Sequence, residues 1–233
     1  TIALGTDATG TLKLDDTELG RLSDGFSSIT IGSTTGTGAI AVNYAGSYTF
    51  TDPLTIRSAS SGGGAITVSD ALNTGTNSLT ITSGGAVSLV AVTSGTLGVT
   101  GTGITLNGNV TTSGTQTYTG AVTLGASMTA ASTGSASTGN NISFSSTVNG
   151  TTTNTESLTI NSGTVGTISV SGIVGGSVTP NTITITNSGG TTFSAAVSTG
   201  TGVKVSLVTR LPARVSSRTP MLDASELSLR SAI

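Results

Sequence analysis

Residues 78–85, Ser-Leu-Thr-Ile-Thr-Ser-Gly-Gly, decide the fold, because close copies of this stretch return along the chain. Residues 157–164 read Ser-Leu-Thr-Ile-Asn-Ser-Gly-Thr, and residues 182–190 read Thr-Ile-Thr-Ile-Thr-Asn-Ser-Gly-Gly. In each copy two apolar side chains stand two positions apart, and a turn rich in Ser, Asn and Gly follows. The pattern predicts a β-strand with one buried face, closed by residues that tolerate positive φ.

A second group of segments shares apolar residues at offsets 0, 2 and 6. Its members are residues 104–110, 142–148 and 168–174, with a looser copy through Phe193 and Val197. The last three copies start about 25 residues apart, and the 38-residue gap before them can hold an inserted loop. A turn-strand-turn-strand unit of this size matches one coil of a β-solenoid, whose repeats commonly span about 20–45 residues. Stacked coils bury the apolar face that one coil leaves open.

The composition favours short strands over any other structure. Only 8% of the 233 residues are charged and 3% are aromatic, while Gly fills 34 positions and the net charge is −2. Globular enzymes carry about a quarter charged residues, and disordered chains combine high net charge with few apolar residues. A sandwich array remains an alternative, but seven aromatic residues spread over the chain and the recurrence of small units favour an all-β solenoid. A membrane barrel would need aromatic girdles.

The absence of two residue types excludes several functional classes. The chain has no Cys and no His, which excludes a disulfide framework, a thiolate metal site and a Ser-His-Asp arrangement. The near-neutral balance provides no basic stripe for nucleic acid. Neither a run of 18 apolar residues nor a signal peptide is present, and we expect Thr1 to lie inside a longer protein.

Three regions follow from the changes in composition. Residues 1–27 form an N-terminal excursion between coils, with a helical turn expected around Asp16 to Leu22 and capped by Asp16 or Thr17. Residues 28–205 carry the solenoid repeats. Residues 206–233 form an atypical tail, which fits either a linker with a short helix near residues 223–230 or a truncated or frameshifted end. The tail contains Arg210, Arg214, Arg218 and Arg230 together with Pro212 and Pro220.

Three phrases resemble large bacterial surface proteins of the filamentous-haemagglutinin-like, β-strand-repeat kind. They are residues 18–32, residues 50–56 and residues 104–124, the last of which contains Thr-Ser-Gly-Thr-Gln-Thr-Tyr. The resemblance covers about residues 10–205. It implies a right-handed parallel β-helix, export through an outer-membrane partner or a fused barrel, and display at the cell surface for adhesion, aggregation or biofilm. It brings no catalytic motif to these positions.

The acidic residues offer one loose catalytic candidate. Asp52, Arg57 and Asp70 are the only charged residues that gather within a coil length of one another in the repeats, and some β-helices act on polysaccharides. Glycoside hydrolysis needs two carboxylates at a set separation. However, Asp52 precedes Pro53 and is typical of a turn. We therefore predict no catalytic, cofactor-binding or metal-binding residues, and a polysaccharide-active β-helix enzyme stays an alternative.

Two further candidates concern surface recognition. Thr182, Thr184 and Thr186 could form a regular ladder, which makes an ice-binding solenoid a second alternative, although such residues usually face solvent without a ligand. Tyr44, Tyr48 and Tyr118 could contact glycans, but we expect their rings to pack against the coils. Gly-Gly pairs lack the following Asp of calcium-binding solenoids, and neither Lys lies in a phosphate-binding loop.

The sequence thus predicts a structural and binding repeat segment of a secreted or surface-displayed bacterial adhesin, not an enzyme. The expected location is extracellular. The expected partners are glycans or proteins of a host or neighbouring cell and an outer-membrane secretion partner, with no nucleic acid. Because complete solenoids carry terminal caps, we also expect self-association through open coil ends.

Overall fold

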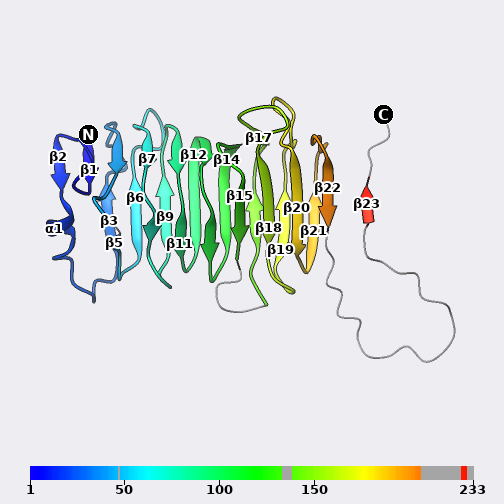
Figure 1. The fold of residues 1–233 in the computed structure, drawn as a ribbon. Coiled ribbons are helices and arrows are strands. Elements are labelled where there is room, and N and C mark those ends of the chain that lie inside the picture. Colours follow the sequence, from blue (N-terminus) through cyan, green and yellow to red (C-terminus); the bar gives the residue numbers. More distant parts are fainter. Residues whose placement is uncertain (47, 133–137, 206–226, 230–233) are drawn as a thin grey trace.

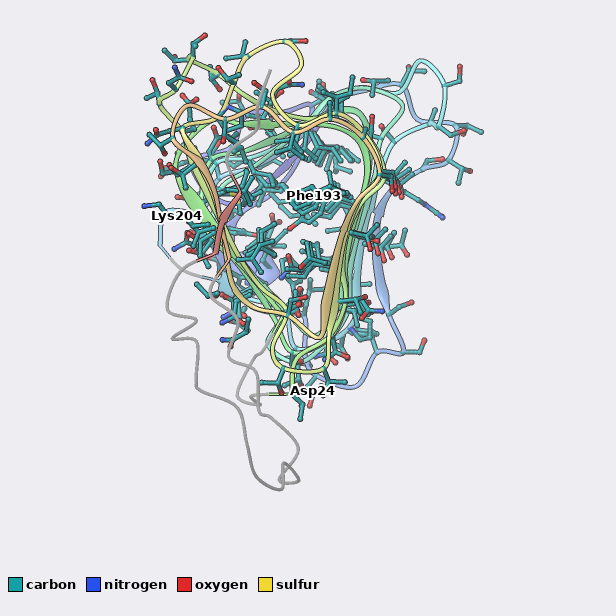
Figure 2. The ribbon with its side chains drawn as sticks, turned by 90° about the vertical axis from the view of Figure 1, so that its right-hand side faces the viewer. Asp24, Phe193 and Lys204 are labelled. Atoms are coloured by element: carbon teal, nitrogen blue, oxygen red, sulfur yellow. The ribbon has the colours of Figure 1, made fainter. Side chains whose placement is uncertain are left out.

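The computed structural model describes residues 1–46, 48–132, 138–205 and 227–229, and these form a right-handed parallel β-helix (Figures 1 and 2). Its strands lie side by side along one axis from the N-terminal to the C-terminal end. The predicted fold class is confirmed. The strands belong to a 14-stranded and a 9-stranded sheet, and all their pairings are parallel except that of the last strand.

Each complete coil contributes to three columns of strands, not to the two that the sequence pattern suggested. The first column stacks β3 (Ile29–Gly32), β6 (Leu54–Arg57), β9 (Leu79–Thr82), the starts of β12 (Leu97–Leu106) and β14 (Gln116–Leu124), β16 (Ile142–Phe144), β19 (Thr167–Val170) and β21 (Gly190–Phe193). The second column stacks β1 (Ile2–Leu4), β4 (Ile40–Val42), β7 (Ile66–Val68), β10 (Val87–Leu89), the ends of β12 and β14, and β17 (Val148–Gly150).

The third column forms the second sheet. It stacks β5 (Tyr48–Thr49), β8 (Leu72–Asn73), β11 (Val92–Ser94), β13 (Val110–Thr112), β15 (Met128–Ala131), β18 (Ser157–Asn161), β20 (Thr182–Asn187) and β22 (Gly202–Val205). Similar phrases therefore occupy different columns: Leu79 lies in the first column, whereas Leu158 and Ile183 lie in the third. The reason is that strands in every column need the same alternation of residues, with one face buried and the other exposed.

The register shows coils of unequal length. Partners in the first column lie 25 residues apart from Leu54 to Leu79, 18 from Leu79 to Leu97, 19 from Leu97 to Gln116, and 26 from Gln116 to Ile142. The 38-residue gap was interpreted as room for an inserted loop, but it contains β13, β14 and β15. The expected period missed these coils because Gln116 stands where the pattern calls for an apolar residue.

The core runs along the inside of the stack. In the first column one inward file consists of Ile31, Ile56, Ile81, Val99, Tyr118, Phe144, Val170 and Phe193. The rings of Tyr118 and Phe144 stack with centroids 4.8 Å apart. Phe193 points into the interior at the C-terminal end of the stack (Figure 2). Alignment of like side chains from coil to coil gives each a neighbour above and below, which maintains close packing.

Hydroxyl groups close the corner between the third and first columns. A Ser or Thr ends the inward file of the third column, and its hydroxyl donates to a carbonyl of the following turn. The pairs are Thr74 with Asn77, Thr112 with Gly114, Ser132 with Asn140 and Ser162 with Gly166. Ser94 is the exception, because its buried Oγ has no partner. These bonds satisfy backbone groups that a turn inside the stack would otherwise leave unpaired.

The N-terminal segment lies at one end of the described stack (Figure 1). The strand β2 (Leu12–Leu14) pairs with β1, which pairs with β4. The helical turn predicted here is present as α1 (Asp16–Leu19), but its cap is Asp15 rather than Asp16 or Thr17. The Asp15 side chain accepts a hydrogen bond from the Glu18 N–H, and the Glu18 side chain accepts one from the Asp15 N–H. The two bonds form a capping box.

The described part of the tail is β23 (Leu227–Leu229), which pairs antiparallel with β22. One of the two interpretations of the tail places a short helix near residues 223–230, but residues 227–229 form a strand. The free edge of β22 supplies backbone hydrogen bonds that a short isolated helix would lack. The four arginines and two prolines of the tail lie outside the described residues.

Candidate functional site

The outward side of the first column presents a regular file of hydroxyl groups, which we call the hydroxyl face. Its central file consists of Thr30, Thr55, Thr80, Thr117, Ser143, Ser169 and Thr192, and Gly98 interrupts the hydroxyls between Thr80 and Thr117. Successive side chains of a strand point to opposite faces, so the Thr between two buried apolar residues must face outward. The sequence Leu-Thr-Ile thus encodes both the core and this face.

A second file runs beside the first and belongs to the same face. It consists of Gly32, Arg57, Thr82, Thr100 and Thr119. Positions of the two files repeat about every 4.8 Å along the axis and about every 6.6 Å along a strand, and hydroxyl side chains occupy all of them except Gly98, Gly32 and Arg57. Thr80, Thr100, Thr117 and Thr119 are exposed, and the hydroxyls of Ser143 and Ser169 hydrogen bond at 2.9 Å. Both lattice directions are therefore set by the backbone.

The middle of the stack carries no charge. From Ala71 to Thr155 the sequence contains no Asp, Glu, Lys, Arg or His, and Arg57 is the one charged residue in the two files just described. A ligand of this face would be recognised by hydrogen bonds to hydroxyl groups and by the shape of the surface, with little Coulomb attraction. Its binding would therefore depend only weakly on salt.

The structure does not bring the carboxylate candidates together. Asp52 precedes β6, at the corner between the third and first columns, and is 3% exposed. Its Oδ1 accepts from the Gly25 N–H at 3.1 Å, and its Oδ2 has no partner. Arg57 ends β6 at the next corner, and Asp70 precedes β8 at the third corner, where it accepts from the Tyr44 N–H at 2.8 Å. In the parts of the chain that the structure describes, no three metal-ligating residues gather.

The tyrosines stabilise the stack, as the sequence led us to expect. Tyr44 and Tyr118 are buried, and burial raises the pKa of both hydroxyls above the ordinary value. Tyr48 is half-buried and donates to the Leu19 carbonyl at 2.5 Å, which ties α1 to the third column. None of these rings offers an open platform to a sugar.

The threonine ladder expected at residues 182–186 is less regular than the hydroxyl face. Thr184 pairs with Thr159 and Lys204 in the third column. A register shift follows Ile160, and Thr186 donates its hydroxyl to the Ile160 carbonyl at 3.3 Å. The irregularity interrupts the spacing on which a ladder depends.

Two buried polar residues were missed by the sequence analysis. Gln116 is fully buried: its Nε2 donates to the Ala131 carbonyl at 2.8 Å, and its Oε1 accepts from Tyr118. Glu156 is 6% exposed and accepts from the N–H groups of Thr151 and Thr152. A signal existed for Glu156, because it ends the long uncharged segment. Both residues hold turns and strands in place.

No protein-family model, curated protein or solved structure matches this chain. Among the described residues, no helix has the length and apolar character needed to cross a membrane.

Proposed function

We propose that this chain is a structural and binding repeat segment of a secreted or surface-displayed bacterial adhesin of the filamentous-haemagglutinin-like kind. The observation that carries the proposal is the continuous stack of coils that presents one hydroxyl face along its length. A rod of this kind has no need of a catalytic centre, because its work is to hold and repeat a surface. The proposed location is outside the cell, after export through an outer-membrane partner.

The proposed mechanism is multivalent contact. A single rung of the face offers a few neutral hydrogen bonds, each of which contributes about 1 kcal/mol net. Repetition along the axis turns many weak contacts into one stable attachment, since each further contact forms at a high effective concentration. The proposed partners are glycans or proteins of a host or neighbouring cell, both of which offer hydroxyl or amide groups.

Beads coated with the purified chain at graded densities test this function. Bacterial or host cells should be captured with a dependence on coating density that is steeper than linear. The double variant Thr80→Lys/Thr117→Lys places two charges on the hydroxyl face and should abolish capture. The matched control Thr93→Lys/Thr111→Lys alters exposed residues of the third column and should preserve it. Equal loss in both variants, or no capture by the unmodified chain, would refute the proposal.

The two regular spacings of the hydroxyl face also favour a second candidate, binding to ice. A lattice of water molecules is matched by a rigid, uncharged grid of hydroxyls more readily than by flexible charged side chains. The test is thermal hysteresis of the purified chain, with shaped ice crystals as a second readout. Activity that disappears in Thr80→Lys/Thr117→Lys would support ice binding, and the absence of both signals would end this candidate.

A further inference from the structure

The chain contains two Asn-Gly pairs, at residues 107–108 and 149–150, and the fold places them in different surroundings. In such a pair the glycine nitrogen can attack the side-chain carbonyl carbon of the asparagine, because glycine has no Cβ to hinder the approach. The first pair lies in the turn between β12 and β13, whereas the second lies inside the strand β17. Chemically equal pairs can therefore be compared within one molecule.

The glycine nitrogen, which is the nucleophile, is free in the first pair and bonded in the second. Among the described residues the Gly108 N–H has no hydrogen-bond partner, whereas the Gly150 N–H donates to the Val178 carbonyl at 2.9 Å. Gly108 is half-buried and Gly150 is buried. A nitrogen that attacks must first give up its hydrogen bond and lose its proton to solvent, so Gly150 can react only after local opening.

The two asparagine side chains, in contrast, are held alike. The Asn107 Nδ2 donates to the Ser88 Oγ at 3.0 Å, and the Asn149 Oδ1 accepts from the Ser177 N–H at 3.0 Å. Asn107 is exposed and Asn149 is half-buried. The main difference between the two pairs is therefore the availability of the glycine nitrogen.

Close packing of neighbouring coils keeps a glycine at position 108. A Cβ at Gly108 would lie 2.9 Å from the Ala91 nitrogen and 3.0 Å from the Val90 carbonyl carbon. Both are backbone atoms, so a larger residue would force two coils apart in a closely packed stack. The stack thus disfavours the residues that would slow an attack on Asn107.

We propose that Asn107 is a site of spontaneous deamidation in the folded chain. The deprotonated Gly108 nitrogen forms a bond to the Asn107 Cγ, the bond from Cγ to Nδ2 breaks, and Nδ2 leaves as ammonia with a proton taken from water. Water then opens the resulting imide ring at one of its two carbonyls, which gives aspartate or isoaspartate. Both products bring a negative charge into the segment from Ala71 to Thr155, which has none.

The isoaspartate product also alters the turn between β12 and β13. The Asn107 N–H donates to the Leu89 carbonyl at 2.7 Å, and the Asn109 carbonyl accepts from the Val92 N–H at 2.9 Å. Isoaspartate adds a carbon atom to the main chain between these two bonds, so their spacing no longer matches the neighbouring coil. The isoaspartate form should therefore unfold at a lower urea concentration than Asn107→Asp, which has the normal main chain.

Peptide mapping by mass spectrometry tests the proposal on the full chain after incubation at mildly alkaline pH. Digestion uses elastase, because the sequence has no Lys or Arg between Arg57 and Lys204. In the folded chain Asn107 should convert at least about fivefold to tenfold faster than Asn149, since Gly150 must first break a hydrogen bond. In urea, which removes both environments, the two pairs should react at similar rates.

Two variants link the charge change to the site. Anion exchange of the aged folded chain should show acidic species that Asn107→Gln lacks and Asn149→Gln keeps, because the longer glutamine side chain closes the ring less readily. Equal rates at the two pairs in the folded chain, or a faster reaction at Asn149, would overturn the proposal. An Asn107 that stays intact in the folded chain but reacts in urea would overturn it as well, since the turn would then protect the pair.

Discussion

The central coils, residues 79–131, and the N-terminal end, residues 1–32, use opposite means to complete the same stack. In the centre the coils are short, every first-column strand has a partner on both sides, and no residue is charged. At the end the chain uses Asp15, Asp16 and Glu18, a four-residue helix and an additional strand. Stacking alone stabilises the middle of the described stack, whereas the N-terminal segment adds specific polar contacts.

The two regions also differ in how tightly their strands are held. The centre has the longest shared register, because β12 and β14 pair over eight residues with one irregularity. The N-terminal segment exposes Leu12 and Phe26. A repeat protein transmits stability mainly between neighbouring repeats, so disturbances at the two places should have different reach.

The largest expected effect is in the central core. Phe144→Ala removes the ring that stacks on Tyr118 and should lower the free energy of unfolding by about 3–5 kcal/mol. Urea denaturation followed by circular dichroism measures this loss. If a single cooperative transition holds, the whole rod loses stability with the centre. A loss below about 1 kcal/mol would mean that the core does not pack as described.

The buried polar pair beside this ring should give the next effect. Gln116→Leu leaves the Tyr118 hydroxyl without its acceptor inside the stack and should cost about 1–3 kcal/mol. Adding Tyr118→Phe should recover part of the loss, because both partners are then apolar. A double-mutant cycle gives the coupling energy. Strictly additive losses would show that the two side chains do not interact.

A smaller effect is expected at the helix cap. Asp15→Ala removes the acceptor for the Glu18 N–H and should cost about 1 kcal/mol, confined to the N-terminal end. Hydrogen exchange should rise in residues 12–22 and stay unchanged in residues 97–124. The exposed Asp24 provides the control, since Asp24→Ala should alter neither segment (Figure 2). Faster exchange in the central strands would contradict a local cap.

The mildest perturbation is acid, and it should act on one region alone. Burial raises the pKa of the Asp16 carboxyl, but hydrogen bonds from the Ala45 and Thr6 N–H groups outweigh it and hold the pKa below the ordinary value. Asp16 therefore stabilises the end at pH values above its unfolded pKa of about 3.9, and this contribution disappears as the pH falls through the folded pKa. The protection factors of the Thr6 and Ala45 amides, which are corrected for the intrinsic pH dependence of exchange, should fall in acid, and Asp16→Asn should remove this fall. The uncharged centre should not respond.

Much of the fold was predictable because the alternation of apolar and polar residues shows which side of each strand is buried and which side is exposed. Leu79, Ile81 and the Thr between them required a one-faced strand, and recurrence required stacking. The assignment to columns was not predictable, since the same phrase suits every column. Gln116 interrupted the apolar pattern and concealed a coil, because its buried hydrogen bonds depend on Tyr118 and Ala131 and not on local sequence.

The sequence analysis considered a ladder of hydroxyl groups but did not locate the hydroxyl face. The sequence offered residues 182–186 as an alternative, whereas the more regular file lies on the first column, where the register aligns Thr30, Thr55 and Thr80. Surfaces that arise from register need the three-dimensional arrangement of coils before they become visible.

Cross-linking of engineered cysteine pairs tests the register of the stack most directly, and the chain has no Cys of its own to interfere. Thr55 and Thr80 are register partners on adjacent strands, so their Cα atoms lie about 4.8 Å apart, within disulfide range. Thr55→Cys/Thr80→Cys should oxidise rapidly and completely, whereas Thr55→Cys/Thr82→Cys, shifted by two residues, should not. Equal or reversed efficiencies would contradict the stacked, in-register coils on which the hydroxyl face depends.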